Sequence, residues 1–111
     1  MKVPYISDTD DWNKKINSGK IIVCDFTATW CGPCKRIAPH YQKLSNQLSA
    51  YNDVVFVKVD VDECKEVASI CKIEAMPTFQ IWNKKQLVHT FKGASQENLK
   101  NIKKYIIQNY I

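Results

Sequence analysis

The sequence predicts one α/β domain over residues 1–111, with a central mixed five-stranded sheet flanked by four helices. Its length of 111 residues is that of a single domain. Two continuous runs of β-branched and aromatic residues are separated by a helical pattern, which is typical of parallel strands joined by a crossover helix. Two later strands follow each other too closely for a crossover, so they must be antiparallel.

The first elements are short and lie before the first apolar run. Residues 2–6 are a candidate extended segment, and Pro4 places it at a sheet edge or a strand end. Polar residues 7–9 offer N-caps for a short helix that ends near Ser18. Residues 20–27 (KIIVCDFT) are almost continuously apolar, which predicts a strand buried on both faces.

The middle of the chain continues this alternation. Residues 34–50 predict a helix whose apolar side chains recur at spacings of three and four, and Pro39 should kink it. Residues 54–61 (VVFVKVDV) predict a second buried strand, and residues 63–72 predict a short helix.

The last part predicts a hairpin and a helix. Strands at residues 78–82 and 87–92 are joined by the turn at residues 83–86, and Ser95 caps a final amphipathic helix. The predicted order is β-α-β-α-β-α-β-β-α, which gives a mixed sheet with helices on both faces.

Composition excludes several classes of protein. Hydrophobic residues make up 45% and charged residues 24%, which disfavours a disordered chain. No apolar run approaches the length of a membrane span, and the first residues become acidic where a secretory signal would be apolar. The net charge of +5 has two interpretations, solubility or an acidic partner.

The chemistry is expected at Trp30-Cys31-Gly32-Pro33-Cys34, between a buried strand and the start of a helix. Unpaired N–H groups at a helix N-terminus stabilise a thiolate, so the pKa of Cys31 should lie below the usual value of about 8.5. Cys34 lies one helical turn away and should be the less exposed, resolving thiol.

The two intervening residues suit this position. Pro33 is tolerated in a first helical turn, and Gly32 leaves space for a substrate chain. Half a zinc site and a purely structural disulfide are the alternatives. Zinc is disfavoured because the sequence has no second C-x-x-C, and its two histidines are 49 residues apart, so we expect no metal.

Asp25 lies in the middle of a predicted buried strand, six residues before Cys31. Burial should raise its pKa, which suits proton transfer to and from Cys34. In this role Lys58, on the next predicted parallel strand, would modulate Asp25. The alternative is a purely structural Asp25 that pairs with Lys58. The Met76–Pro77 bond could be cis, but sequence spacing does not decide it.

Three cysteines lie outside the dithiol. Cys24 is interpreted as a small buried core residue. Cys64 and Cys71 lie on one predicted helix about 10 Å apart, too far to bond unless that helix unwinds. They are either two reduced thiols or candidates for regulatory oxidation.

Several segments resemble the thioredoxin family. They are VCDFTATWCGPCK, FVKVDVD, AMPTF and FKGA, and the match runs from about residue 21 to about residue 93. The DVDECKEVASIC segment is similar to the eukaryotic cytosolic branch. The resemblance implies that Cys31 attacks, that Cys34 resolves and that Asp25 is the buried acid–base group. It also implies a cis Pro77 packed against the dithiol. Substrate would dock beside the following residues: Trp30, Ala75, Met76, Pro77, Gly93 and Ala94.

The resemblance further implies a general protein-disulfide reductase with no bound cofactor and a reversible Cys31–Cys34 disulfide. NADPH would be used indirectly, through thioredoxin reductase. Expected partners are that reductase and disulfide proteins such as peroxiredoxins and ribonucleotide reductase. We expect no nucleic acid and no membrane as partners, a mostly monomeric chain, and a place in the cytoplasm and also the nucleus. The alternatives are a glutathione-dependent oxidoreductase and a redox-regulated binding subunit.

Overall fold

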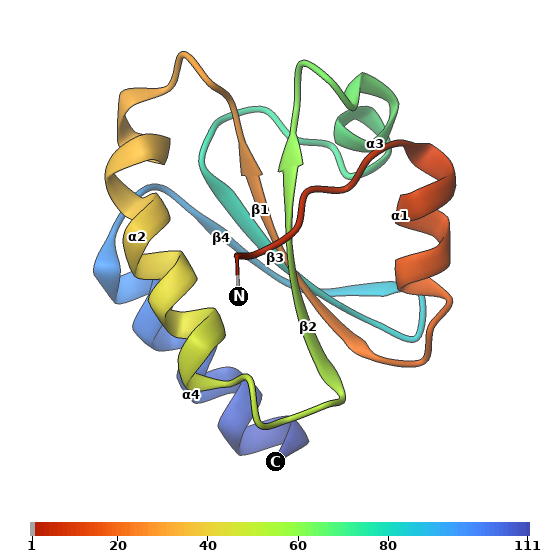
Figure 1. Ribbon diagram of the computed structural model, residues 1–111, viewed down its shortest axis with the longest axis vertical. Coiled ribbons are helices and arrows are strands. Elements are labelled where there is room, and N and C mark those ends of the chain that lie inside the picture. The colour runs from red at the N-terminus through yellow and green to blue at the C-terminus, as the bar shows by residue number, and fades with distance from the viewer. Residues whose placement is uncertain (1) are drawn as a thin grey trace.

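The apolar runs of the sequence form the centre of the molecule. In the computed structural model, which describes residues 2–111, a sheet of four strands lies between two pairs of helices (Figure 1). The elements, in chain order, are α1 (Thr9–Ile16), β1 (Ile21–Thr27), α2 (Gly32–Gln47), β2 (Val54–Asp60), α3 (Lys65–Ile70), β3 (Thr78–Asn83), β4 (Gln86–Lys92) and α4 (Gln96–Tyr110).

The sheet is mixed, as predicted, and its strand order is β2-β1-β3-β4. β1 pairs with β2 in parallel and with β3 in antiparallel, and β3 pairs with β4 in antiparallel. Because β1 and β2 are parallel, their carboxyl ends meet at one edge, the upper edge in Figure 1. The segments that follow both strands are therefore brought together at that edge.

The prediction of a fifth strand at residues 2–6 is wrong. Within the described chain this segment contributes one parallel bridge, between Tyr5 and Lys58. The backbone N–H of Lys58 donates to the carbonyl of Pro4, and the N–H of Ile6 donates to the carbonyl of Lys58. Pro4 has no N–H of its own, so the pairing does not extend into a strand.

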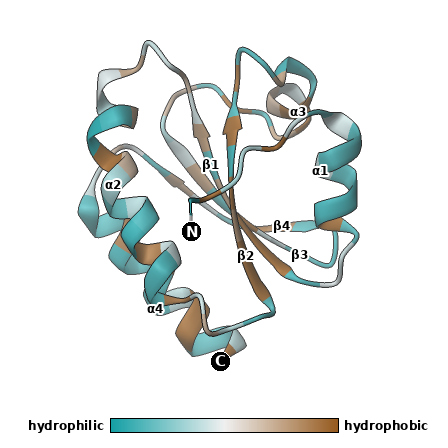
Figure 2. Ribbon diagram, viewed as in Figure 1, coloured by the Kyte–Doolittle hydropathy of each residue, from teal (hydrophilic) through white to brown (hydrophobic). Residues whose placement is uncertain are grey.

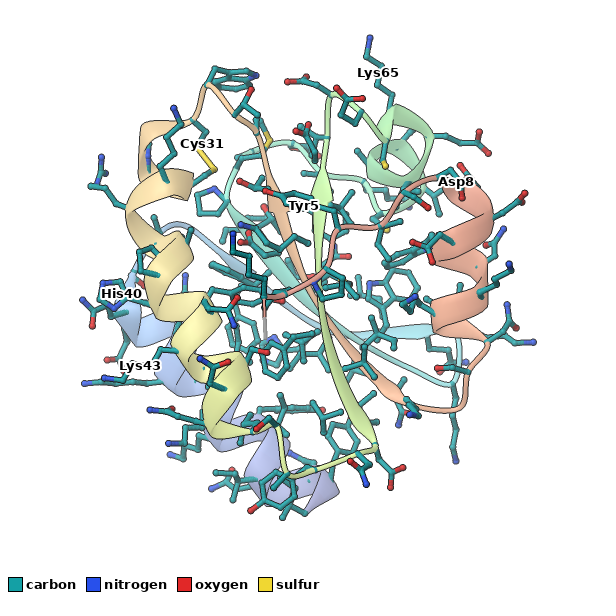
Figure 3. All side chains as sticks on the ribbon, viewed as in Figure 1. Tyr5, Asp8, Cys31, His40, Lys43 and Lys65 are labelled. Atoms are coloured by element: carbon teal, nitrogen blue, oxygen red, sulfur yellow. A yellow bond between two sulfur atoms is a disulfide. The ribbon has the colours of Figure 1, made fainter. Side chains whose placement is uncertain are left out.

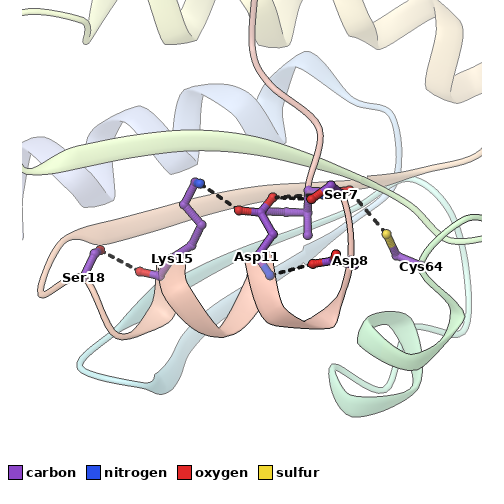
Figure 4. Close-up of polar contacts among 7 residues, drawn as sticks. Ser7, Asp8, Asp11, Lys15, Ser18 and Cys64 are labelled. Carbon is purple, nitrogen blue, oxygen red and sulfur yellow. Dashed lines mark hydrogen bonds and ion pairs between the residues drawn. The ribbon is translucent and has the colours of Figure 1, made fainter.

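Helix boundaries differ from the predicted ones by a few residues. α2 begins at Gly32 rather than at residue 34, because Cys31 itself is the N-cap, and it ends at Gln47. Pro39 lies inside α2, where it donates no backbone hydrogen bond. At α1 the cap is Asp8, whose carboxylate accepts from the N–H of Asp11 at 2.8 Å (Figure 4).

The two faces of the sheet bury separate cores, because side chains alternate along each strand. Val23 faces α2 and α4 together with Tyr41 and Phe79. Cys24 and Phe26 face α1 and α3. The brown, hydrophobic segments in Figure 2 accordingly lie along the strands between the two helical layers.

Tyr41 ties α2 to the sheet. Its ring is buried, and its hydroxyl lies 3.0 Å from the carbonyl oxygen of Val23 and 2.9 Å from that of Val57. One side chain of α2 therefore contacts the backbones of both parallel strands, which fixes the helix that carries the dithiol.

The β3–β4 hairpin turns without a glycine. Lys84 and Lys85 have φ angles of 52° and 66°, in the left-handed region. A tight hairpin turn requires this conformation of both central residues, and glycine or asparagine is the usual choice. The predicted turn is therefore present, with lysines in positions that disfavour them.

Candidate functional site

The two cysteines of the dithiol lie between the end of β1 and the first turn of α2. The residues between β1 and α2 form a short turn, and Cys31 caps the helix: its Sγ accepts a hydrogen bond from the N–H of Cys34 at 3.2 Å. Cys31 and Cys34 form a disulfide, with Cα atoms 5.3 Å apart. The structure confirms that the C-x-x-C spacing brings the two sulfurs together at a helix N-terminus.

Exposure barely separates the two cysteines, since Cys31 is 5% exposed and Cys34 is 2% exposed. Their surroundings separate them better. The Sγ of Cys31 lies 3.8 Å from the carbonyl oxygen of Met76, on the side of the proline loop. Cys34 lines a pocket of about 240 Å³ on the other side, together with Lys58 and Tyr5. Figure 3 shows Cys31 at the start of α2.

The proline loop packs against the dithiol. The Met76–Pro77 peptide bond is cis, as the resemblance implied. Met76 packs on the small cluster that contains both cysteines, and Pro77 is buried. The N–H of Gly93 donates to the carbonyl of Pro77 at 3.0 Å, so the segment before α4 is attached to the same loop.

The predicted docking residues surround Cys31 unevenly. Trp30 is 66% exposed, and Ala75 and Gly93 are also exposed. Gly93 has a φ of 101°, a conformation that other residues adopt only with strain. Ala94 instead packs against the core under α2 and α4.

Asp62 is a site residue that the prediction missed. Its carboxylate accepts a hydrogen bond from the indole Nε1–H of Trp30 at 2.8 Å, which holds the exposed ring in place. Asp62 follows β2 as Trp30 follows β1. The parallel pairing of these strands was the signal that could have predicted the contact.

Asp25 is completely buried, and neither of its carboxyl oxygens has a hydrogen-bond partner in residues 2–111. It lies on the α2 side of β1, the side that carries the dithiol, because side chains on a strand alternate and Cys24 packs under α1 and α3. Loss of solvation raises the pKa of Asp25 to about 7, although the positive charge of Lys58 acts in the opposite direction.

Lys58 is the direct pairing partner of Asp25 in the β1–β2 register, as predicted. It forms no ion pair with Asp25: within the described chain the one ion pair joins Lys15 to Asp11, at 3.0 Å. The ammonium of Lys58 instead lies over the ring of Tyr5, 5.1 Å from its centroid. Tyr5 was not predicted here, because nothing in the sequence places the first residues over this pocket.

The other three cysteines are buried in the core under α1 and α3. Cys64 and Cys71 flank α3, at its N-cap and C-cap, rather than lying within it. The thiol of Cys64 donates to the carbonyl of Ile6 at 3.3 Å. Burial raises the pKa of Cys64 and raises that of Cys71 to about 12, so neither is a ready nucleophile in the folded chain.

Residues 2–111 contain neither a metal-binding cluster nor a membrane-spanning helix. No group of three or more His, Cys, Asp or Glu side chains is arranged to hold a metal ion. None of the helices described is both long enough and apolar enough to cross a membrane.

Comparison with known proteins identifies the relatives of this chain. The thioredoxin family model matches residues 3–108. Thioredoxin from Coprinus comatus is 46% identical over 100 residues, covering 90% of this chain and 93% of the relative. Thioredoxin from Sus scrofa is 52% identical over 99 residues, covering 87% and 91%.

Solved structures agree. Plasmodium falciparum thioredoxin has a TM-score of 0.86 at 37% identity, covering 93% of this chain and 98% of its own. A second structure has a TM-score of 0.81 at 38% identity, covering 93% of this chain and 94% of its own. It comes from work on thiol resolution in a yeast mitochondrial 1-Cys peroxiredoxin via glutathione and thioredoxin systems. With the Cys31–Cys34 pair, these matches give the chain the chemistry of a protein-disulfide oxidoreductase, dithiol–disulfide exchange. The chain belongs to the thioredoxin family.

Proposed function

We propose that this protein is a general reductant of protein disulfides in which Cys31 attacks and Cys34 resolves. The observation that carries the proposal is the position of Cys31. Its sulfur caps α2 and faces the proline loop, whereas Cys34 lies in the first turn of the helix.

In the first step the Cys31 thiolate attacks one sulfur of a client disulfide. The client S–S bond breaks, a mixed disulfide with Cys31 forms, and the departing client thiolate takes up a proton. The N–H of Cys34, which points at Sγ of Cys31, stabilises the attacking thiolate. The exposed backbone at Ala75 and the Trp30 ring provide the surface beside which the client strand lies.

In the second step Cys34 attacks Sγ of Cys31 and releases the second client thiol. Asp25 accepts the proton of the Cys34 thiol. The client sulfur leaves as a thiolate that takes up a proton from water, and Asp25 later returns its own proton to water. A carboxyl with a pKa of about 7 exchanges protons readily near neutral pH. The client disulfide gains two electrons and two protons, and Cys31 and Cys34 become the disulfide.

The cycle closes when the disulfide is reduced again. We propose thioredoxin reductase as the donor, with NADPH as the ultimate source of the two electrons, in the cytoplasm and the nucleus. Peroxiredoxins and ribonucleotide reductase are the proposed clients. The structural neighbour studied with a 1-Cys peroxiredoxin supports the first of these client classes.

Reduction of insulin by dithiothreitol, followed by turbidity, tests the roles of the two cysteines. Both Cys31→Ser and Cys34→Ser should abolish catalysis. Only Cys34→Ser should accumulate a mixed disulfide with insulin, because it keeps the attacking sulfur and loses the resolving one. A mixed disulfide trapped on Cys34 in the Cys31→Ser variant would reverse the assignment. Turnover with glutathione alone would instead favour a glutathione-dependent oxidoreductase.

A further inference from the structure

The positive charge of the chain is concentrated in one helical layer. α2 carries three lysine or arginine residues and no acid, and α4 carries three lysines and one acid, Glu97. These two helices therefore hold an excess of five positive charges, equal to the formal net charge of +5 of the whole chain. The rest of the chain is balanced.

A groove between these helices collects part of this charge. It has a volume of about 300 Å³, and its basic lining residues are His40, Lys43, Lys100 and Lys103. The apolar residues Leu44 and Leu99 complete its lining with Gln47 and Gln96. Figure 3 shows His40 and Lys43 projecting from α2 away from the sheet.

No acid neutralises these lysines among the residues that the structure describes. The Nζ of Lys103 donates to the amide oxygen of Gln47 at 3.2 Å, a neutral partner. The ion pair between Lys15 and Asp11 lies on α1, in the opposite layer. The groove therefore presents ammonium groups that no acid among residues 2–111 neutralises, above a floor formed by the nearly buried Leu44 and Leu99.

The groove continues toward the dithiol. A second hollow of about 430 Å³ shares His40 and Gln96 with it and is also lined by Arg36 and Ala94. Ala94 follows Gly93, whose N–H is bonded to the carbonyl of Pro77 in the loop beside Cys31. A client chain that lies beside Cys31 and the proline loop can therefore continue through this second hollow into the basic groove.

We propose that this groove binds an acidic segment of client proteins that lies in sequence near the disulfide under attack. This inference rests on the proposed function, because it selects among the clients of Cys31. Lys43 is 12 residues beyond Cys31, about 18 Å along α2 at a rise of about 1.5 Å per residue. An extended client chain spans that distance with about five or six residues. The acidic segment should therefore begin at about that separation from the client cysteine.

The lining favours a protein segment over a nucleic acid. Nucleic-acid grooves combine positive charge with aromatic side chains on which bases stack. Neither hollow is lined by a tyrosine, phenylalanine or tryptophan among the described residues. A groove edged with lysines suits a peptide segment that presents several carboxylates.

Peptide disulfides test the proposal directly. One peptide carries a run of glutamates about five residues from its disulfide, and a second carries glutamines at the same positions. Each peptide is made in two forms, with the run on the N-terminal or on the C-terminal side of the disulfide. The rate constant for reduction by the dithiol form is measured by acid quench and chromatography. The wild type should reduce one of the glutamate peptides roughly threefold to tenfold faster than its glutamine counterpart. Salt at about 0.3 M should remove this preference.

Two triple variants with the same change in net charge provide the control. Lys43→Gln/Lys100→Gln/Lys103→Gln should lose the preference and reduce the glutamine peptide at the wild-type rate. A variant on the opposite side, Lys14→Gln/Lys20→Gln/Lys65→Gln, should keep it. Thermal melting by circular dichroism checks that both variants fold.

Three results would overturn the proposal. They are no preference in the wild type, an equal loss of preference in both triple variants, and a preference that survives the groove substitutions. Oligonucleotide binding in fluorescence anisotropy that needs the groove lysines, with no preference for glutamate, would also refute it. Failure of the wild type to reduce either peptide would instead refute the proposed function.

Discussion

The replacement Asp25→Asn should stabilise the protein above neutral pH and lose this advantage in acid. The carboxyl is fully buried and has no hydrogen-bond partner within residues 2–111. Its pKa is raised from 3.8 to about 7, chiefly by loss of solvation. The folded state therefore binds a proton that the unfolded state has already released, over the whole range between these two values.

The sign and size of the effect follow from linkage. Because the folded state binds more protons between about pH 4 and pH 7, the free energy of unfolding falls as pH rises through this window. Each pKa unit corresponds to about 1.4 kcal/mol, so Asp25 costs the wild type about 4 kcal/mol above pH 7 relative to pH 4. Asparagine cannot ionise, so the variant lacks this dependence.

Guanidinium unfolding followed by circular dichroism, with the Cys31–Cys34 disulfide intact, measures the difference. Unfolding free energies are compared at about pH 4.5 and pH 8.5, on either side of the folded pKa. The gain of the variant over the wild type should be larger at the higher pH by several kcal/mol. Asp53→Asn, at an exposed aspartate, is the matched control and should show no such change. An equal difference between wild type and Asp25→Asn at both pH values would refute the reasoning.

Three other substitutions or modifications test the rest of the site. Lys58→Met should raise the pKa of Asp25 further, because it removes the positive charge that lowers this pKa. Infrared titration of the carboxyl band measures this pKa, and a lower value than in the wild type would contradict the prediction. Tyr41→Phe should cost about 1–3 kcal/mol, measured by chemical unfolding, because it removes the buried hydroxyl that lies between the carbonyls of Val23 and Val57. In the reduced native protein, iodoacetamide should label Cys31 first, because the N–H of Cys34 stabilises its thiolate, whereas burial raises the pKa of Cys24, Cys64 and Cys71. Equal labelling of all five cysteines, measured by mass spectrometry, would contradict this reasoning.

The strands were predictable because β1 is buried along its whole length and β2 buries Phe56, Val57 and Val59, on both of its faces, so both segments are mainly apolar. The register that places Lys58 beside Asp25 also followed from the two parallel runs. The start of α2 was less accessible to prediction. Its cap is a cysteine sulfur, which lies outside the usual set of capping residues, so the helix was expected two residues late.

Other parts of the site depend on tertiary contacts that no local pattern reveals. The bond between Trp30 and Asp62 spans two loops that meet only after β1 and β2 have paired. The position of Tyr5 over Lys58 depends on how the first residues cross the sheet. The predicted fifth strand failed for a related reason, because the local pattern gave the extended conformation but not the number of strand hydrogen bonds.

The sulfur of Cys31 is both the reactive atom and the cap of α2, and a substitution can remove the first role while keeping the second. The amide that holds its sulfur is the backbone N–H of Cys34, so a side-chain replacement elsewhere in the molecule does not remove this group. A serine at this position would keep an oxygen acceptor for the same amide, so the inactive protein should retain the start of its helix. Alanine would lose activity and the cap together. Neither Gly32 nor Pro33 takes part in this hydrogen bond, so the cap does not depend on which side chains occupy those two positions.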